Sequence, residues 1–236
     1  MLPRASGLRL PSLCAVCHGW GRRRVCADCA KRFAPAVPRC RRCALEVPEG
    51  IAVCGGCRID PPPYRGALAA VSYGYPWDRL IAAYKFHSAL DVAPAFTDLL
   101  LDAHRRSDTA APALLLAVPL SAERLRERGY NQAWELARRL GRALGCRADP
   151  ALLLRVRDTP HQLAFPPDRR AANVRGAFAV EPRRGVELHG RQVTVVDDVM
   201  TSGATAAEVA RVLLAAGAAS VDVWVVARTP RPESSA

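Results

Sequence analysis

Two adjacent aspartates, Asp197 and Asp198, end an apolar run in the segment VTVVDDVMTSGAT at residues 193–205. Neighbouring carboxylates repel each other, so such a pair favours a partner such as a metal ion, a sugar diol or a basic side chain. A turn of small residues follows, and it comprises Thr201, Ser202, Gly203, Ala204 and Thr205. The free N–H groups of a helix that begins there, together with the hydroxyls, favour a phosphate. The segment therefore predicts a ligand with a phosphate and vicinal hydroxyls, such as ribose 5-phosphate.

Eight of the nine cysteines form four C-x-x-C pairs, with gaps of 8, 10 and 10 residues between the pairs. Two such pairs can direct four sulfurs at one tetrahedral zinc ion. Pairing in chain order predicts two sites, whose ligands are Cys14, Cys17, Cys26 and Cys29, and Cys40, Cys43, Cys54 and Cys57. An interleaved arrangement is the alternative. Because four thiolates leave no open position on the ion, the zinc is expected to be structural.

The cysteine-containing segment is also the most basic part of the chain. Residues 1–66 carry 12 basic and 4 acidic residues, against 22 and 18 in the remainder. Trp20 stands beside three consecutive arginines, Arg22, Arg23 and Arg24, and such a cluster suits the backbone and bases of a single-stranded nucleic acid. The other interpretation is solvated loops in a protein that uses arginine almost everywhere in place of lysine.

Length and composition allow one or two domains with a proper core. No apolar run is long enough for a transmembrane helix. The first residues lack the apolar core of a signal peptide, so we expect a cytoplasmic protein, in which disulfides between the cysteines are disfavoured. The proline run IDPPPYRG at 59–66 predicts a stiff linker, with a cysteine module over 1–60 and a second domain over 61–236. We expect the linker to separate the surfaces of the two parts.

Apolar runs and amphipathic runs alternate through the second part of the chain. Strands are predicted over residues 67–73, 113–120, 191–197 and 220–227, and helices over 77–86, 92–105, 131–144 and 204–217. This alternation predicts an α/β domain, a parallel sheet with helices on both faces. Ligands of such sheets bind at the carboxyl ends of the strands, which is where the two aspartates are predicted to lie.

The stretch VVDDVMTSGAT resembles the phosphoribosyl-diphosphate (PRPP) motif of type I phosphoribosyltransferases. With the cysteine module ahead of it, the whole chain resembles the ComF family of competence-related proteins. The likeness includes YKF at 84–86, VPL at 118–120, RGYNQ at 128–132 and GAF at 176–178, as well as the spaced residues Thr159, Gln162, Arg170 and Asn173. It implies a type I phosphoribosyltransferase-like domain preceded by a small double zinc ribbon.

The resemblance also implies roles for individual residues. Asp197 and Asp198 would hold the ribose hydroxyls, and residues 201–205 would hold the 5-phosphate. The loop over 119–132 would hold pyrophosphate through Arg124, Arg128 and Gly129, although surface charge is the other interpretation of these arginines. Lys85, one of only two lysines, is a further phosphate candidate.

The segment 155–175 falls where type I enzymes carry a mobile hood over PRPP. Gln162, Arg170 and Asn173 are its candidate lid residues, and a static loop is the alternative.

Several functions remain open on this evidence. The first is a PRPP-binding protein that handles single-stranded DNA in natural transformation, with a helicase-like translocase as a candidate partner. The second is an active phosphoribosyltransferase that uses Mg²⁺ and transfers ribose 5-phosphate from PRPP to a nitrogen nucleophile. The third is a sensor that binds PRPP without turnover.

Overall fold

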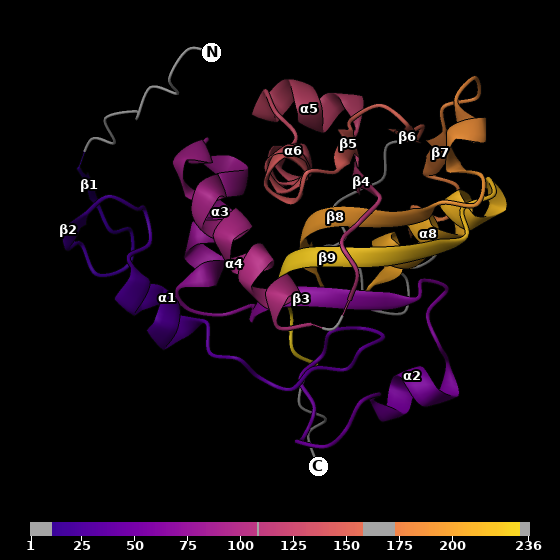
Figure 1. Ribbon diagram of the computed structural model, residues 1–236. Coiled ribbons are helices and arrows are strands. Elements are labelled where there is room, and N and C mark those ends of the chain that lie inside the picture. The colour runs from indigo at the N-terminus through magenta and orange to yellow at the C-terminus, as the bar shows by residue number, and fades with distance from the viewer. Residues whose placement is uncertain (1–10, 108, 158–172, 232–236) are drawn as a thin grey trace, which may run out of the picture.

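The computed structural model describes residues 11–107, 109–157 and 173–231 (Figure 1). Within these ranges, no helix combines the length and the apolar character that crossing a membrane requires.

A five-stranded sheet forms the centre of the protein. Its strands are β3 (Gly66–Ser72), β4 (Leu114–Ala117), β5 (Arg147–Asp149), β8 (Gln192–Met200) and β9 (Ser220–Arg228). They lie in the order β3-β9-β8-β4-β5, and every neighbouring pair is parallel. The four predicted strands are confirmed. β8 lies at the middle of the sheet, and it continues three residues beyond its predicted end at 197.

Helices cover both faces of this sheet, as the alternating pattern predicted. One face packs against α3 (Trp77–Phe86), α4 (Ala93–Arg105) and α6 (Gln132–Leu144), and the other packs against α8 (Ala204–Ala215). Side chains alternate along β8, so Val196 joins the first apolar core and Val195 joins the second. Because both faces are buried, the central strands consist almost entirely of apolar residues before they reach the aspartates.

The prediction of a loop over 119–132 is wrong in part, because α5 (Ala122–Arg128) occupies its centre. The side chain of Ser121 accepts a hydrogen bond from the N–H of Arg124 at 3.3 Å and caps the start of this helix. Gly129 ends the helix with a φ of 75°, a conformation that glycine adopts without a steric penalty. The predicted helix over 131–144 is confirmed as α6, with Asn131 as its N-cap.

Two strands that the sequence analysis did not predict, β6 (Leu153–Arg155) and β7 (Phe178–Val180), form an antiparallel pair. They flank the segment expected to act as a hood. The side chain of Glu208 on α8 accepts a hydrogen bond from the N–H of Gly176 at 2.7 Å. The base of this segment is therefore attached both to the sheet domain and to α8.

The cysteine segment contains the short strands β1 (Ser12–Leu13) and β2 (Trp20–Gly21) and the helices α1 (Ala27–Phe33) and α2 (Gly55–Ile59). It runs beside α3 and α4 and along the β3 edge of the sheet (Figure 1). The indole N–H of Trp77 donates to the carbonyl of Phe33 at 2.7 Å, and the N–H of Ala67 donates to the carbonyl of Arg41 at 3.0 Å. The cysteine segment therefore packs directly against the second part of the chain.

Asp149 at the end of β5 joins several elements. Its side chain is buried, accepts hydrogen bonds from the N–H groups of Ala151 and Leu152, and pairs with Arg147 and Arg184. Burial alone would raise the pKa of this carboxyl, but the hydrogen bonds from Arg184 and from the backbone hold the pKa below its ordinary range.

We predict that Asp149→Asn lowers the free energy of unfolding by about 2 kcal/mol at pH 7, because hydrogen bonds to a charged group are lost. The folded-state pKa is depressed, so this contribution is present above the unfolded pKa of about 4 and is lost as the pH falls below it. Urea titrations between pH 3 and pH 7 measure the difference. Asp102→Asn, in an exposed pair with Arg105, is the control and should cost less than about 1 kcal/mol. Equal losses in both variants would contradict the prediction.

Candidate functional site

The two aspartates lie near the carboxyl end of β8, and their side chains point to opposite faces of the sheet. Asp198 lies on the face covered by α3, and Asp197 lies on the face covered by α8, as the alternation of a strand requires. Asp198 is buried and Asp197 is half-buried. The N–H of Asp198 donates to Oδ1 of Asp197 at 2.8 Å. This N–H stabilises the Asp197 carboxylate, while the charge of Asp198 still acts against it.

Lys85, in the last turn of α3, is the direct partner of Asp198. Its Nζ lies 2.8 Å from Oδ1 of the carboxylate, whose side chain is 4% exposed. Burial would lower the pKa of Lys85, but the charge of Asp198 raises the pKa above its usual value. Within the described residues, the second oxygen of Asp198, Oδ2, is buried and accepts no hydrogen bond. A buried acceptor without a partner costs free energy, which is typical of a strained or functional position.

Asp197 has the most perturbed carboxyl at this end of the sheet. Burial and the neighbouring charge of Asp198 together raise its pKa to about 7, although Lys85 and the N–H of Asp198 oppose this rise. A carboxyl whose pKa is raised this far by burial and a like charge is typical of a binding or catalytic site.

The turn over 201–205 lies directly beside Asp197. Gly203 is the N-cap of α8 with a φ of 84°, and the N–H of Ala204 donates to the Ser202 hydroxyl at 3.3 Å. A hollow of about 30 Å³ is bordered both by Asp197 and by residues of this turn, which are Thr201, Gly203, Ala204 and Thr205. A carboxylate and the N-terminal end of a 12-residue helix therefore face the same small space.

Arg228 holds the start of this turn, and the sequence analysis missed it. The guanidinium is buried at the end of β9, where Nη1 donates to the carbonyls of Met200 at 2.9 Å and of Thr201. An arginine that closes the otherwise apolar run VWVVAR was the signal available in the sequence.

The predicted pyrophosphate residues lie on α5 and next to it. The guanidinium of Arg128 stacks on the ring of Phe86, 5.0 Å from its centroid, and Nη1 donates to Oε1 of Gln132 at 3.0 Å. The charge of Arg128 also acts on Lys85, where it lowers the lysine pKa. Arg124 lies one turn earlier on α5, and Gly129 ends that helix. The structure thus brings Arg128 near Lys85 and the aspartates.

Two of the candidate lid residues, Gln162 and Arg170, lie outside the described residues. Asn173 is described, and its carbonyl accepts a hydrogen bond from the Arg157 guanidinium at 3.3 Å. The roles of all three in a lid stay predictions.

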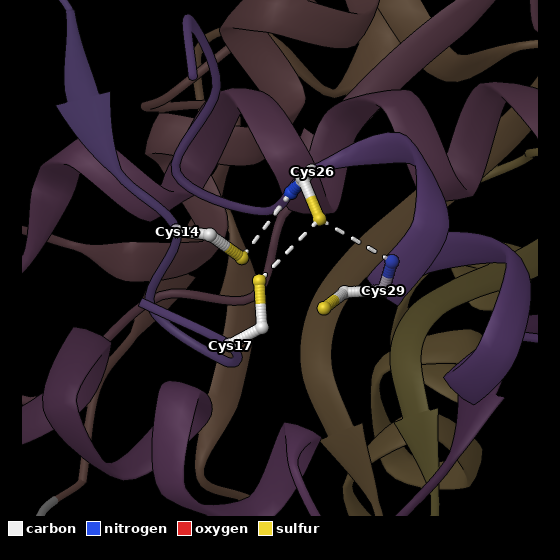
Figure 2. A group of neighbouring side chains, drawn as sticks. All are labelled: Cys14, Cys17, Cys26 and Cys29. Atoms are coloured by element: carbon white, nitrogen blue, oxygen red, sulfur yellow. Dashed lines mark hydrogen bonds between the residues drawn. The ribbon is translucent and has the colours of Figure 1, made fainter. Parts of the chain in front are cut away.

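The cysteines gather into two groups of four in chain order, and the interleaved alternative is not observed. Within each group the sulfurs lie within 4.8 Å of one another. Figure 2 shows the first group, in which the four side chains turn toward a common point. The sulfurs of Cys17 and Cys26 lie 3.8 Å apart and those of Cys43 and Cys54 lie 3.6 Å apart, and both distances are too long for a disulfide. A tetrahedral zinc ion with Zn–S bonds of about 2.3 Å needs sulfurs about 3.8 Å apart, so the donor sets fit.

Backbone donors favour the thiolate form at both groups. The N–H of Cys26 donates to the sulfur of Cys14 at 3.4 Å, and the N–H of Cys54 donates to that of Cys40 at 3.3 Å. Burial would raise the pKa of these thiols, yet such N–H groups lower it to about 6 for Cys14 and about 7 for Cys40. Both groups therefore contain a ligand that is readily deprotonated.

The arginine cluster is divided between two environments. Arg23 pairs with Asp98 at 3.3 Å, and Arg24 pairs with Asp91 at 2.7 Å, so both are directed toward α4 and the turn before it. Arg22 is exposed and Trp20 is 79% exposed on the neighbouring strand. Of the predicted nucleic-acid surface, Arg23 and Arg24 are therefore paired with aspartates, whereas Trp20 and Arg22 are exposed.

No family model matches this chain, but several known proteins are similar to it in sequence over most of its length. The chain is 34% identical to the DNA utilization protein YhgH of Salmonella typhimurium, over 94% of this chain and 99% of that one. It is 30% identical to competence protein F of Haemophilus influenzae, over 86% of this chain and 90% of that one. Among solved structures, it is similar to the adenine phosphoribosyltransferase of Leishmania tarentolae with 13% identity, over 71% of this chain and 92% of that one, at a TM-score of 0.38.

We predict that Asp197→Asn stabilises the protein above neutral pH. With a folded-state pKa of about 7, the native protein keeps a proton that the unfolded chain, with a pKa near 4, has lost. The free energy of unfolding therefore falls as the pH rises through this window. Since one pKa unit corresponds to about 1.4 kcal/mol, the advantage of the variant should grow by roughly 3 kcal/mol between pH 5 and pH 8.

Urea titrations at the two pH values measure this difference. The exposed Asp60 offers the matched control, because Asp60→Asn should leave the difference near zero at both. An advantage of Asp197→Asn that does not grow with pH would show that burial is not what perturbs the carboxyl.

Proposed function

Because this chain belongs to the family of DNA utilization protein YhgH and competence protein F, we propose that it acts in the use of DNA and that its β8 site binds ribose 5-phosphate or PRPP. The observation that carries the ligand is the shared hollow of Asp197 and the 201–205 turn. The helix N-terminus attracts a phosphate, and a carboxylate at the strand end accepts hydrogen bonds from ribose hydroxyls. A sugar phosphate satisfies both ends of the site.

The same residues support a bound Mg²⁺. This ion prefers carboxylate oxygens and substrate phosphates and keeps several of its waters. The carboxylate of Asp197, which borders the same hollow as the turn, is the group that would meet the ion or its waters. When bound, the ion would neutralise charge on a pyrophosphate group.

Turnover of PRPP is the second candidate, and Arg128 supports it. This guanidinium lies beside Lys85 at the carboxyl ends of the strands, where a departing pyrophosphate needs a cation. The reaction would be displacement of pyrophosphate by a nitrogen nucleophile, which classes the protein as a phosphoribosyltransferase. Pyrophosphate release with a panel of nucleobases separates this enzyme from a sensor that only binds PRPP.

Each cysteine group, we propose, holds one structural zinc ion. The sulfur separations and the backbone N–H donors support this. Such sites contribute roughly 10–16 kcal/mol of folding free energy in small modules. The cysteine segment needs that contribution, because its own apolar cluster around the second group contains only Cys40, Cys43 and Leu45 as buried members.

We propose that the exposed side chains of Trp20 and Arg22 form a surface that binds single-stranded DNA. An exposed indole offers a platform for a base, and the neighbouring guanidinium suits a phosphate. A helicase-like translocase remains the partner that the proposed role in DNA uptake suggests.

Ribose 5-phosphate or PRPP should raise the melting temperature in the presence of Mg²⁺. Ligand at 100 times its Kd stabilises the native state by about 2.7 kcal/mol. The gain should be larger at pH 8 than at pH 6, because Asp197 is ionised only above a pKa of about 7. Asp197→Asn should remove most of the gain and leave two zinc ions per chain, measured by metal analysis; Asp197→Ala with Asp198→Ala should abolish it. Asp60→Asn should bind like the wild type, and a double variant with unchanged binding would place the ligand elsewhere.

Arg22→Ala should weaken binding of a single-stranded oligonucleotide and reduce the slope of log K against log salt by about 0.7, the value for one phosphate contact. Adding Arg23→Ala and Arg24→Ala should reduce the slope little further, because Asp98 and Asp91 already neutralise them. Trp20→Ala should weaken binding by roughly 1–3 kcal/mol with the slope unchanged, since stacking releases no counterions. Arg142→Ala on α6 is the control. If Trp20→Ala and Arg22→Ala both bind like the control, this surface does not contact DNA.

A further inference from the structure

The second cysteine group touches the ligand turn through one buried side chain. Arg228 donates from Nε to the carbonyl of Cys43 at 2.8 Å, and from Nη1 to the carbonyls of Met200 and Thr201. One guanidinium therefore joins the backbone of Cys43, whose sulfur is a proposed zinc ligand, to Thr201, the first residue of the turn. The first cysteine group instead packs with α3 and α4 in the other core.

Arg228 is a buried cation that forms no ion pair with a carboxylate in the described part of the chain. A charge in such a position needs compensation from hydrogen-bonded dipoles or from an anion. Carbonyl groups supply the dipoles, and four thiolates with one zinc ion carry a net charge of about −2. Arg39, which is 14% exposed and lies 3.8 Å from the carboxylate of Glu46, donates to the carbonyl of Ala44 at 3.1 Å. The loaded second site thus has two cations beside its Cys43-Ala44 turn.

Apolar and weakly polar contacts also connect the second cysteine group to the 201–205 turn. Ala44, Tyr64 and Met200 belong to the core beneath α8. The hydroxyl of Tyr64 lies 3.9 Å from the sulfur of Met200, and it lies 3.4 Å from the position that a Cβ on Gly203 would take. The turn is therefore enclosed on this side by residues that pack against the second cysteine group.

We propose that Arg228 is a positioning residue that couples the metal in the second cysteine group to the shape of the 201–205 turn, so that metal there and sugar phosphate at the turn stabilise each other. The half that concerns sugar phosphate rests on the proposed function. The half that links the metal to the turn stands on the contacts alone. Coupling of this kind is reciprocal and typically changes each affinity 5- to 150-fold.

The test uses the full chain with cadmium-113 in both cysteine groups, where each four-thiolate site gives its own NMR resonance. A Cys17→Ser variant identifies the resonance of the first group. Arg228→Gln should shift the resonance of the second group alone and speed release of that metal to a chelator by about tenfold. Arg228→Lys, which keeps the charge but loses the fork of donors, should fall between this variant and the wild type. Arg24→Gln, at the contact of the first group with Asp91, is the matched control and should leave the second resonance unchanged.

Gly203→Ala perturbs the turn without any ligand, since its φ of 84° disfavours a side chain. It should also speed metal release from the second group and not from the first. Ribose 5-phosphate with Mg²⁺ should slow this release in the wild type, and its affinity should fall about tenfold in Arg228→Gln.

Release rates within twofold of the wild type in both Arg228→Gln and Gly203→Ala would overturn the coupling, whatever the ligand does. Faster release in both variants, with no ribose 5-phosphate binding by the wild type, would support the coupling and refute the proposed ligand. Each cysteine group has its own resonance, so loss of the first resonance as well as the second would show that Arg228→Gln has unfolded. In that case the resonance of the second group in Arg228→Lys decides whether the coupling exists.

Discussion

The structure depends on the burial of negative charge at the carboxyl end of its central strand. β8 lies between β9 and β4, and Asp197 and Asp198 lie near its carboxyl end. Asp198 is stabilised there by Lys85, whereas Asp197 keeps a raised pKa. The free energy lost in burying Asp197 is a cost to stability, and a ligand that meets its carboxylate can offset it. Stability and binding are in this sense opposed at the same residue.

Arginine side chains help to attach the cysteine segment, whereas the sheet domain is held together by apolar packing. The cysteine segment contributes few large apolar side chains, and its attachment relies on guanidinium groups that reach backbone carbonyls. Arg42 donates to the carbonyls of Arg65 and Pro62, and Arg228 donates to that of Cys43. The basic character that suggests a nucleic-acid surface is therefore partly structural. What remains for DNA is concentrated near Trp20 and Arg22.

Much of the fold was predictable because its signals are local. Alternating apolar strands and amphipathic helices repeat along the second part of the chain, and the order of the four C-x-x-C pairs already indicated which cysteines meet. The failures were short elements. α5 carries a polar, arginine-rich sequence with no buried residue, so it has no apolar stripe to reveal it. β5, β6 and β7 have three residues each, too few for a periodic pattern.

The sequence by itself determined that two carboxylates precede a small-residue turn at the end of a strand, and that eight cysteines form four C-x-x-C pairs with the spacing of zinc ligands. It could not determine which partners those groups meet. Lys85 reaches Asp198, and Arg228 reaches both Cys43 and the turn, only because the sheet order brings distant segments together. Likewise, the pairing of Arg23 and Arg24 with acidic residues depends on how the cysteine segment packs against α4. Such contacts join residues far apart in the chain, and no local pattern encodes them; the packing of the two apolar cores decides them.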